Sequence, residues 1–167
     1  MSKAIAISND KQIKYLNKYY NIVKVLLTVT PFVYLIYLSM GSSNVGVSIS
    51  DIIQKDPKFS VMFLVSMINP FMAYLLMFMH KRIDSNDVEY AVVNLLMFII
   101  AEILLQNLLY IVIFVFILHK TLKTYNLTII DSFKQKIKEG FFMTISGSMV
   151  VIVLASICLF ATIRIAM

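Results

Sequence analysis

The residues best suited to chemistry are a carboxylic acid and several amides in stretches that are otherwise apolar. Glu102 lies near the middle of the apolar run 88–118, which contains neither Gly nor Pro, and Gln106 follows four residues later on the same helical face. A charged side chain at membrane depth costs at least about 2.5–3.5 kcal/mol on insertion scales. The carboxyl is therefore expected to face a protein interior, to be protonated or to line a polar path. Amide side chains of the same stretches complete this candidate intramembrane site: Glu102, Gln106, Asn107, Asn69 and Asn94.

Two functions are open to this candidate site. It could bind a proton or a cation, with the carboxylate alternating between charged and neutral states. It could instead be a structural contact, within this chain or to a partner's transmembrane helix. Transport sites usually recruit several ionisable groups, and this chain has one at membrane depth. The structural interpretation is therefore favoured.

The sequence carries no pattern that predicts an enzyme, a cofactor or a metal site. It has no HExxH, no CxxC and no Gly-rich phosphate loop, and Cys158 is its single cysteine. His80 and His119 each end an apolar stretch and are followed by a lysine. Both are therefore expected at the level of the lipid headgroups. We expect a non-enzymatic protein that binds neither cofactor nor metal.

The composition places the chain in a membrane. Its 167 residues are 60% hydrophobic and 14% charged, and the mean hydropathy is +0.85, which is too apolar for an ordinary soluble domain. A membrane-crossing helix needs roughly 20 apolar residues. We predict an all-α integral membrane bundle of four transmembrane helices, at about residues 22–40, 59–80, 88–118 and 141–163. These make one domain over residues 22–167, after a separate segment 1–21.

Two basic segments flank these spans. Segment 1–21 and the loop 121–140 each combine lysines with apolar residues at helical spacing, which predicts two basic amphipathic helices at the membrane surface. Anionic lipid headgroups are a more economical partner for them than nucleic acid. The lysines expected at the headgroups are Lys11, Lys14, Lys18, Lys134, Lys136 and Lys138.

The last span begins with small residues that would let another helix approach closely. They are Ser146, Gly147 and Ser148. We expect this face to pack within the bundle, in a homo-oligomer or against another membrane subunit.

The membrane topology depends on residues 88–118. With four simple spans and the N-terminus inside, eight Lys and Arg residues would lie inside and seven outside. The positive-inside rule therefore gives almost no preference for either orientation. A re-entrant hairpin turning near residues 102–107 would divide them twelve to three. We favour the single span because a turn at membrane depth usually needs Gly, Pro or an enclosing cavity. Both termini are then predicted to be cytoplasmic.

These features favour a partner-dependent protein in the plasma membrane. The abundance of Ile, Lys and Asn and the absence of Trp suggest a bacterial source. The leading expectation is an accessory or regulatory subunit of a transporter, secretion or sensor complex, including immunity to a membrane-active peptide. The alternative is a small oligomeric transporter or channel that uses Glu102.

Overall fold

The computed structural model describes the backbone of residues 2–45 and 48–166, and side chains within these ranges except at 2–10, 41–45, 49, 52, 55, 139 and 166. The described backbone forms helices joined by short connections, which confirms the all-α prediction. The helices are α1 (Ser2–Val45), α2 (Ile49–Lys55), α3 (Pro57–Asp84), α4 (Val88–Leu104), α5 (Leu108–Tyr125) and α6 (Ile129–Ala166).

Four helical segments of the described chain are long and apolar enough to cross a membrane. They are Lys11–Met40, Pro57–Asp84, Leu108–Tyr125 and Gly140–Ile165. Their exposed side chains are largely apolar, as in Phe32, Ile36 and Val153, which suits contact with lipid. An all-helical protein with four candidate spans is confirmed, which is consistent with a membrane protein, although the third span is not the predicted one.

The prediction of one helix over residues 88–118 is wrong. The run folds into two helices, because α4 ends at Leu104 and α5 begins at Leu108. Gln106 adopts the left-handed conformation (φ 57°). The backbone N–H of Asn107 donates to the carbonyl of Glu102 at 3.0 Å, and that of Gln106 donates to Ile103 at 3.1 Å. These two bonds form a Schellman motif, which satisfies the last carbonyls of α4 without a glycine.

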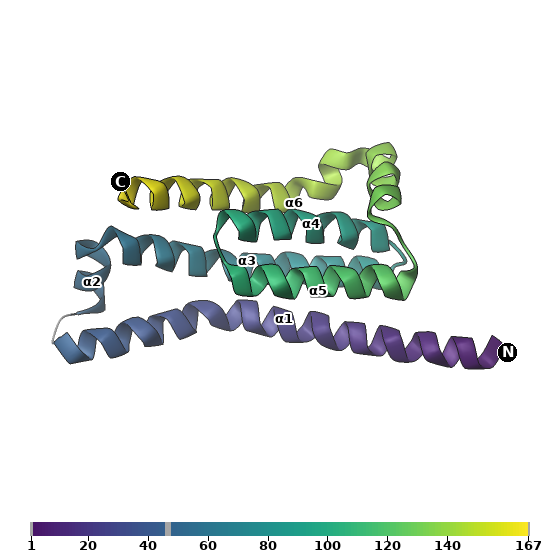
Figure 1. Ribbon diagram of the computed structural model, residues 1–167, viewed down its shortest axis with the longest axis horizontal. Coiled ribbons are helices and arrows are strands. Elements are labelled where there is room, and N and C mark those ends of the chain that lie inside the picture. Colours follow the sequence, from purple (N-terminus) through teal and green to yellow (C-terminus); the bar gives the residue numbers. More distant parts are fainter. Residues whose placement is uncertain (1, 46–47, 167) are drawn as a thin grey trace.

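The hairpin of α4 and α5 is shorter than the helices around it. Helix α4 has 17 residues and α5 has 18, against 28 in α3. Helix α4 packs against α3, α5 and α6, while α1 packs against α3 and α5. Figure 1 shows that α1, α3 and α6 continue past the turn between α4 and α5. The core is therefore thickest toward the end where α1 begins.

The two termini lie at opposite ends of the bundle (Figure 1). Because residues 88–125 form two helices instead of one, the chain passes along the bundle an odd number of times. A long axis that crosses a membrane would therefore put the termini on opposite sides, whereas the sequence predicted both in the cytoplasm. We call the end where α1 begins the basic end, and the end where α6 finishes the distal end.

Neither basic amphipathic helix is confirmed as predicted. Residues 2–21 of the first segment are the first part of the continuous helix α1, whose first turns extend past the other helices (Figure 1). Residues 129–139 are helical, but a non-helical Gly140 (φ 110°, ψ 73°) sets them at a steep angle to the rest of α6. We call residues 129–139 the elbow helix. Ile130 is 66% exposed and Ile137 is 61% exposed, so the apolar face predicted for this segment points away from the bundle.

Candidate intramembrane polar site

Glu102 is enclosed in the core, near the end of α4. Its side chain is 0% exposed, and neither carboxyl oxygen accepts a hydrogen bond from the described part of the chain. Asn107 is the amide that interacts with this carboxyl, but it does not reach hydrogen-bonding geometry. A buried carboxylate without a partner costs far more than a buried neutral acid. This carboxyl therefore needs either a proton or a positively charged neighbour.

A cavity of about 360 Å³ lies at the turn between α4 and α5. We call it the vestibule. Its wall comes from α1, α3, the turn itself and α6, which positions it between the three helices that continue past the hairpin. Its lining residues are Thr30, Tyr34, Val61, Met62, Val65, Ser66, Asn69, Leu104, Leu105, Gln106, Asn107, Cys158, Leu159 and Thr162.

Asn69 contributes an unsatisfied acceptor to the vestibule. The residue is 1% exposed, and its Oδ1 atom has no hydrogen-bond partner among the described residues. The large majority of buried side-chain oxygens in proteins accept at least one hydrogen bond. An unpaired one on a cavity wall is therefore a position where a bound donor would be stabilised.

The hydroxyl groups of the vestibule also present acceptors. Thr30 donates to Leu26 O at 2.8 Å, and Ser66 donates to Phe63 O at 2.7 Å. Thr162 donates to Cys158 O at 2.9 Å. In the same way, Tyr34 donates to Phe59 O at 3.2 Å. Since each hydroxyl has one proton, these four groups have lone pairs left for the cavity and no free donor.

The wall on the α1 side is fixed by a contact with α5. The Tyr110 hydroxyl is hydrogen-bonded to Thr30 Oγ1. Because the proton of Thr30 is already donated to Leu26, Tyr110 is the donor in this pair. Its proton is therefore unavailable to the Glu102 carboxyl.

A closely packed apolar layer lies one to two helical turns from the turn between α4 and α5, toward the basic end. Phe98 and Phe114 pack edge to face with ring centroids 5.4 Å apart. Both side chains are fully buried, as are Leu95, Met72 and Leu76. None of these five side chains is among the residues that line the vestibule, so the described lining does not reach across this layer.

Asn94 lies apart from this group. Its Nδ2 donates to Tyr90 O at 2.8 Å and to Thr144 O at 3.1 Å, while its Oδ1 accepts from Ser148 Oγ at 2.5 Å. These bonds fasten α4 to α6. The structure therefore brings Asn69, Gln106 and Asn107 to one cavity, and it places Asn94 in an interhelical contact.

The three small residues of α6 lie in different environments and do not form one packing face. Gly147 lies where α6 meets α3, and a Cβ there would be 2.7 Å from Leu75 Cδ2. Ser148 is buried against Asn94. Ser146 is exposed and bonds only within its own helix, to Met143 O at 3.4 Å.

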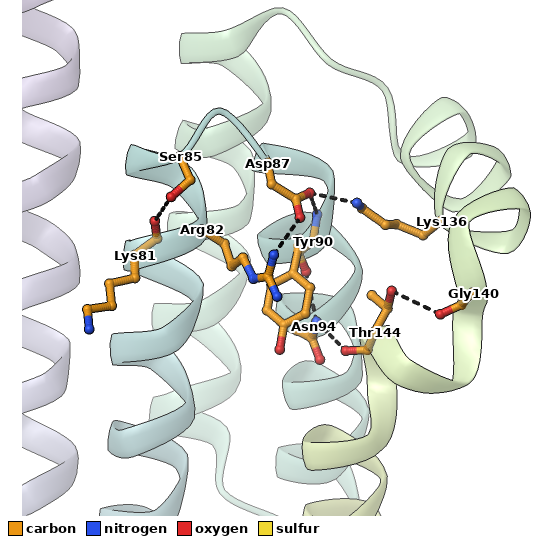
Figure 2. A network of polar contacts seen from close by, with 9 residues as sticks. All are labelled: Lys81, Arg82, Ser85, Asp87, Tyr90, Asn94, Lys136, Gly140 and Thr144. Atoms are coloured by element: carbon orange, nitrogen blue, oxygen red, sulfur yellow. Dashed lines mark hydrogen bonds and ion pairs between the residues drawn. The ribbon is translucent and has the colours of Figure 1, made fainter.

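Lys136 corrects one of the expected headgroup contacts. It is 5% exposed, and its Nζ lies 2.7 Å from Asp87 Oδ1. Figure 2 shows it reaching from the elbow helix to Asp87, which also accepts from Tyr90 N at 3.2 Å and pairs with Arg82 at 3.7 Å. Asp87 is the N-cap of α4. Sequence analysis missed this network because nothing marked Asp87 as the partner of a residue 49 positions away.

The other five expected headgroup lysines are exposed. Lys11, Lys14 and Lys18 follow one face of α1, along a shallow groove of about 950 Å³ that also includes Asn17. Lys134 and Lys138 point outward from the elbow helix. All five lie toward the basic end.

A second polar contact missed by the sequence joins α1, α3 and α5 near the basic end. Lys24 Nζ lies 3.3 Å from His80 Nδ1, and the His80 ring stacks on Tyr20 with centroids 5.4 Å apart. Tyr20 also shares a 3.2 Å hydrogen bond with Thr121. Because the Lys24 ammonium is a donor, His80 Nδ1 is the acceptor. His80 therefore joins two helices instead of facing the headgroups.

Among the described residues, no cluster of three or more His, Cys, Asp or Glu could hold a metal ion. The comparisons with known proteins found no match: no family model, no curated protein and no solved structure is significantly similar to this chain.

Proposed function

We propose that the protein is a non-enzymatic accessory or regulatory subunit of a plasma membrane complex, such as a transporter, a secretion system or a sensor, or that it confers immunity to a membrane-active peptide. The observation that supports this proposal is the apolar layer around Phe98 and Phe114, which lies next to the vestibule. A channel needs a polar path from one side to the other, and the fully buried side chains of this layer offer none. A cavity that carries polar groups on one side of such a layer suits recognition better than conduction.

We infer that the basic end faces the cytoplasm. By their place in the helices, twelve of the fifteen Lys and Arg residues belong to this end, and the other three belong to the distal end. Cytoplasmic segments carry an excess of Lys and Arg. The N-terminus is then inside, the end of α6 is outside, and the vestibule lies toward the outer face. The twelve are Lys3, Lys11, Lys14, Lys18, Lys24, Lys81, Arg82, Lys120, Lys123, Lys134, Lys136 and Lys138.

Anionic lipid headgroups are the proposed partners of the exposed lysines at the basic end, where several lysines share one surface. Each Lys or Arg close to an anionic leaflet contributes about 1 kcal/mol to its attraction. The exposed Ile130 and Ile137 of the elbow helix would enter the apolar part of the same interface.

Purification from native membranes in a mild detergent, followed by mass spectrometry and native mass determination, tests the subunit role. We expect an unrelated membrane protein in a fixed ratio to this chain. A variant with Lys134→Gln and Lys138→Gln is a suitable control, because it changes the exposed charge without touching the core. Recovery of the chain as a homo-oligomer alone would contradict this role.

The second candidate function is a small oligomeric transporter or channel that uses Glu102. The unpaired carboxyl favours it, because ionisable groups within membrane domains commonly mark ion or proton pathways. Reconstitution in liposomes distinguishes the two candidates. A transporter gives a flux that Glu102→Ala abolishes, whereas an accessory subunit alone gives none.

A further inference from the structure

We propose that the vestibule binds an organic cation whose head group carries N–H donors, such as a primary alkylammonium. Asn69 Oδ1 and the lining hydroxyl oxygens would accept its hydrogen bonds, and Glu102 would supply the opposite charge. This inference goes beyond the subunit role proposed above, because it concerns the purified chain alone.

The unpaired acceptor on the cavity wall indicates the chemistry of the head group. Asn69 Oδ1 has no partner, and the protons of Thr30, Ser66 and Thr162 are donated to backbone carbonyls. A ligand that offers only acceptors would leave these oxygens unsatisfied, which is unfavourable in a buried site. A ligand with several N–H donors would satisfy them.

The charged groups near the cavity indicate the charge of the ligand. No Lys, Arg or His is among the described residues that line it. Glu102 lies one helical turn before the turn residues of the wall, and Asn107, which lines the cavity, is the amide that interacts with its carboxyl. A charge interaction is stronger in an enclosed site than in water. A cation in the vestibule would therefore stabilise the ionised carboxylate, which otherwise has no partner.

The size and the apolar part of the wall define the rest of the ligand. A single water occupies about 30 Å³ in the liquid, so a cavity of about 360 Å³ is far larger than one bare metal ion needs. Val61, Val65 and Leu159 provide an apolar surface beside the acceptors. A short alkyl chain on the ammonium group would cover that surface.

Calorimetric titration of the purified protein in lipid nanodiscs tests the proposal. The probe is n-pentylammonium, and the matched control is pentyltrimethylammonium, which has the same charge and chain but no N–H donor. We expect saturable binding of one n-pentylammonium per chain, and binding of the trimethyl compound at least about tenfold weaker. Equal binding of the two compounds, or no saturable binding to the folded protein, would overturn the proposal.

Two variants locate the bound cation. Asn69→Leu and Glu102→Gln should each weaken n-pentylammonium binding at least about tenfold. Asn69→Leu removes an oxygen that no protein group uses, so the fold should tolerate it. Thr28→Val is the control variant, because Thr28 is exposed and bonds only to Lys24 O of its own helix. Unchanged affinity in both variants would place the cation elsewhere and reject the site.

Cys158 supplies an independent measurement in the unmodified chain. It is the single cysteine of the sequence, and it lines the vestibule while being 4% exposed. Saturating n-pentylammonium should slow its reaction with a small maleimide at least about threefold, because the bound ligand fills the space before the thiol. An unchanged rate, at ligand concentrations that saturate the calorimetric signal, would contradict binding in this cavity.

Discussion

The backbone N–H of Asn107 donates to the carbonyl of Glu102 across the turn between α4 and α5, at 3.0 Å. The chain therefore reverses direction directly after Glu102, the one fully buried carboxyl among the described side chains. This bond belongs to a Schellman motif in which Gln106 occupies the left-handed position. The same motif that returns α5 toward the basic end also brings Gln106 and Asn107 to the vestibule.

The left-handed Gln106 gives the first prediction. Gln106→Gly should stabilise the fold by about 1 kcal/mol, because glycine adopts φ near 57° without the steric cost that a Cβ imposes. The measurement is the unfolding free energy in detergent by chemical denaturation. Gln12→Gly is the matched control and should destabilise by about 1 kcal/mol, since residue 12 lies exposed within α1. Destabilisation by both changes would show that Gln106 is helical, as in a continuous span.

The Lys136–Asp87 ion pair gives the second prediction. Lys136→Met should destabilise the protein by about 1–3 kcal/mol, because it removes the closest cation of the partly buried Asp87 and leaves the Tyr90 N–H and the longer contact to Arg82. Hydrogen exchange should increase over residues 129–139 as the elbow helix loosens. Lys134→Met, an exposed neighbour, should change stability by less than about 0.5 kcal/mol. Equal effects of the two changes would contradict the buried position of Lys136.

The close approach of α6 to α3 gives the third prediction. A side chain at Gly147 would meet Leu75 Cδ2 at 2.7 Å, so Gly147→Val should cost about 1–3 kcal/mol through overpacking. Gly147→Ala should cost less, because the end of the Leu75 side chain can move. The control is Ser146→Ala on the exposed face, which should be nearly neutral. Thermal unfolding in one detergent ranks the three variants, and a neutral Gly147→Val would contradict the contact.

Sequence analysis predicted the helices from hydropathy, since apolar length alone identifies a membrane span. It ranked a turn near residues 102–107 second to a single span, because it expected Gly, Pro or an enclosing cavity at a turn at membrane depth. Two other connections carried a recognisable signal, because Asn86 and Asn126 also adopt positive φ, a conformation that asparagine tolerates well. Gln106 carried no such signal.

The candidate site was predicted in part. The sequence indicated that amides from two apolar stretches could meet, and Asn69 lies with Gln106 and Asn107 at the vestibule. Helical spacing could not show that Asn94 bonds Thr144 and Ser148 instead. The spacing shows which residues share a face of one helix, but not which other helix packs against that face. The unpaired oxygen of Asn69 could not be predicted either, since it depends on which groups of other helices lie around it.

The most direct test of the account asks whether the two ends of segment 88–125 lie on one side of the membrane. Cys158→Ala provides a background without cysteine, to which Ser85→Cys or Thr128→Cys is added, and a membrane-impermeant maleimide is applied to intact and to permeabilised cells. We predict that both positions are labelled only after permeabilisation, as a hairpin with its ends at the cytoplasmic basic end requires. Labelling of one position in intact cells and of the other only after permeabilisation would mean that this segment crosses the membrane once, and would contradict the account.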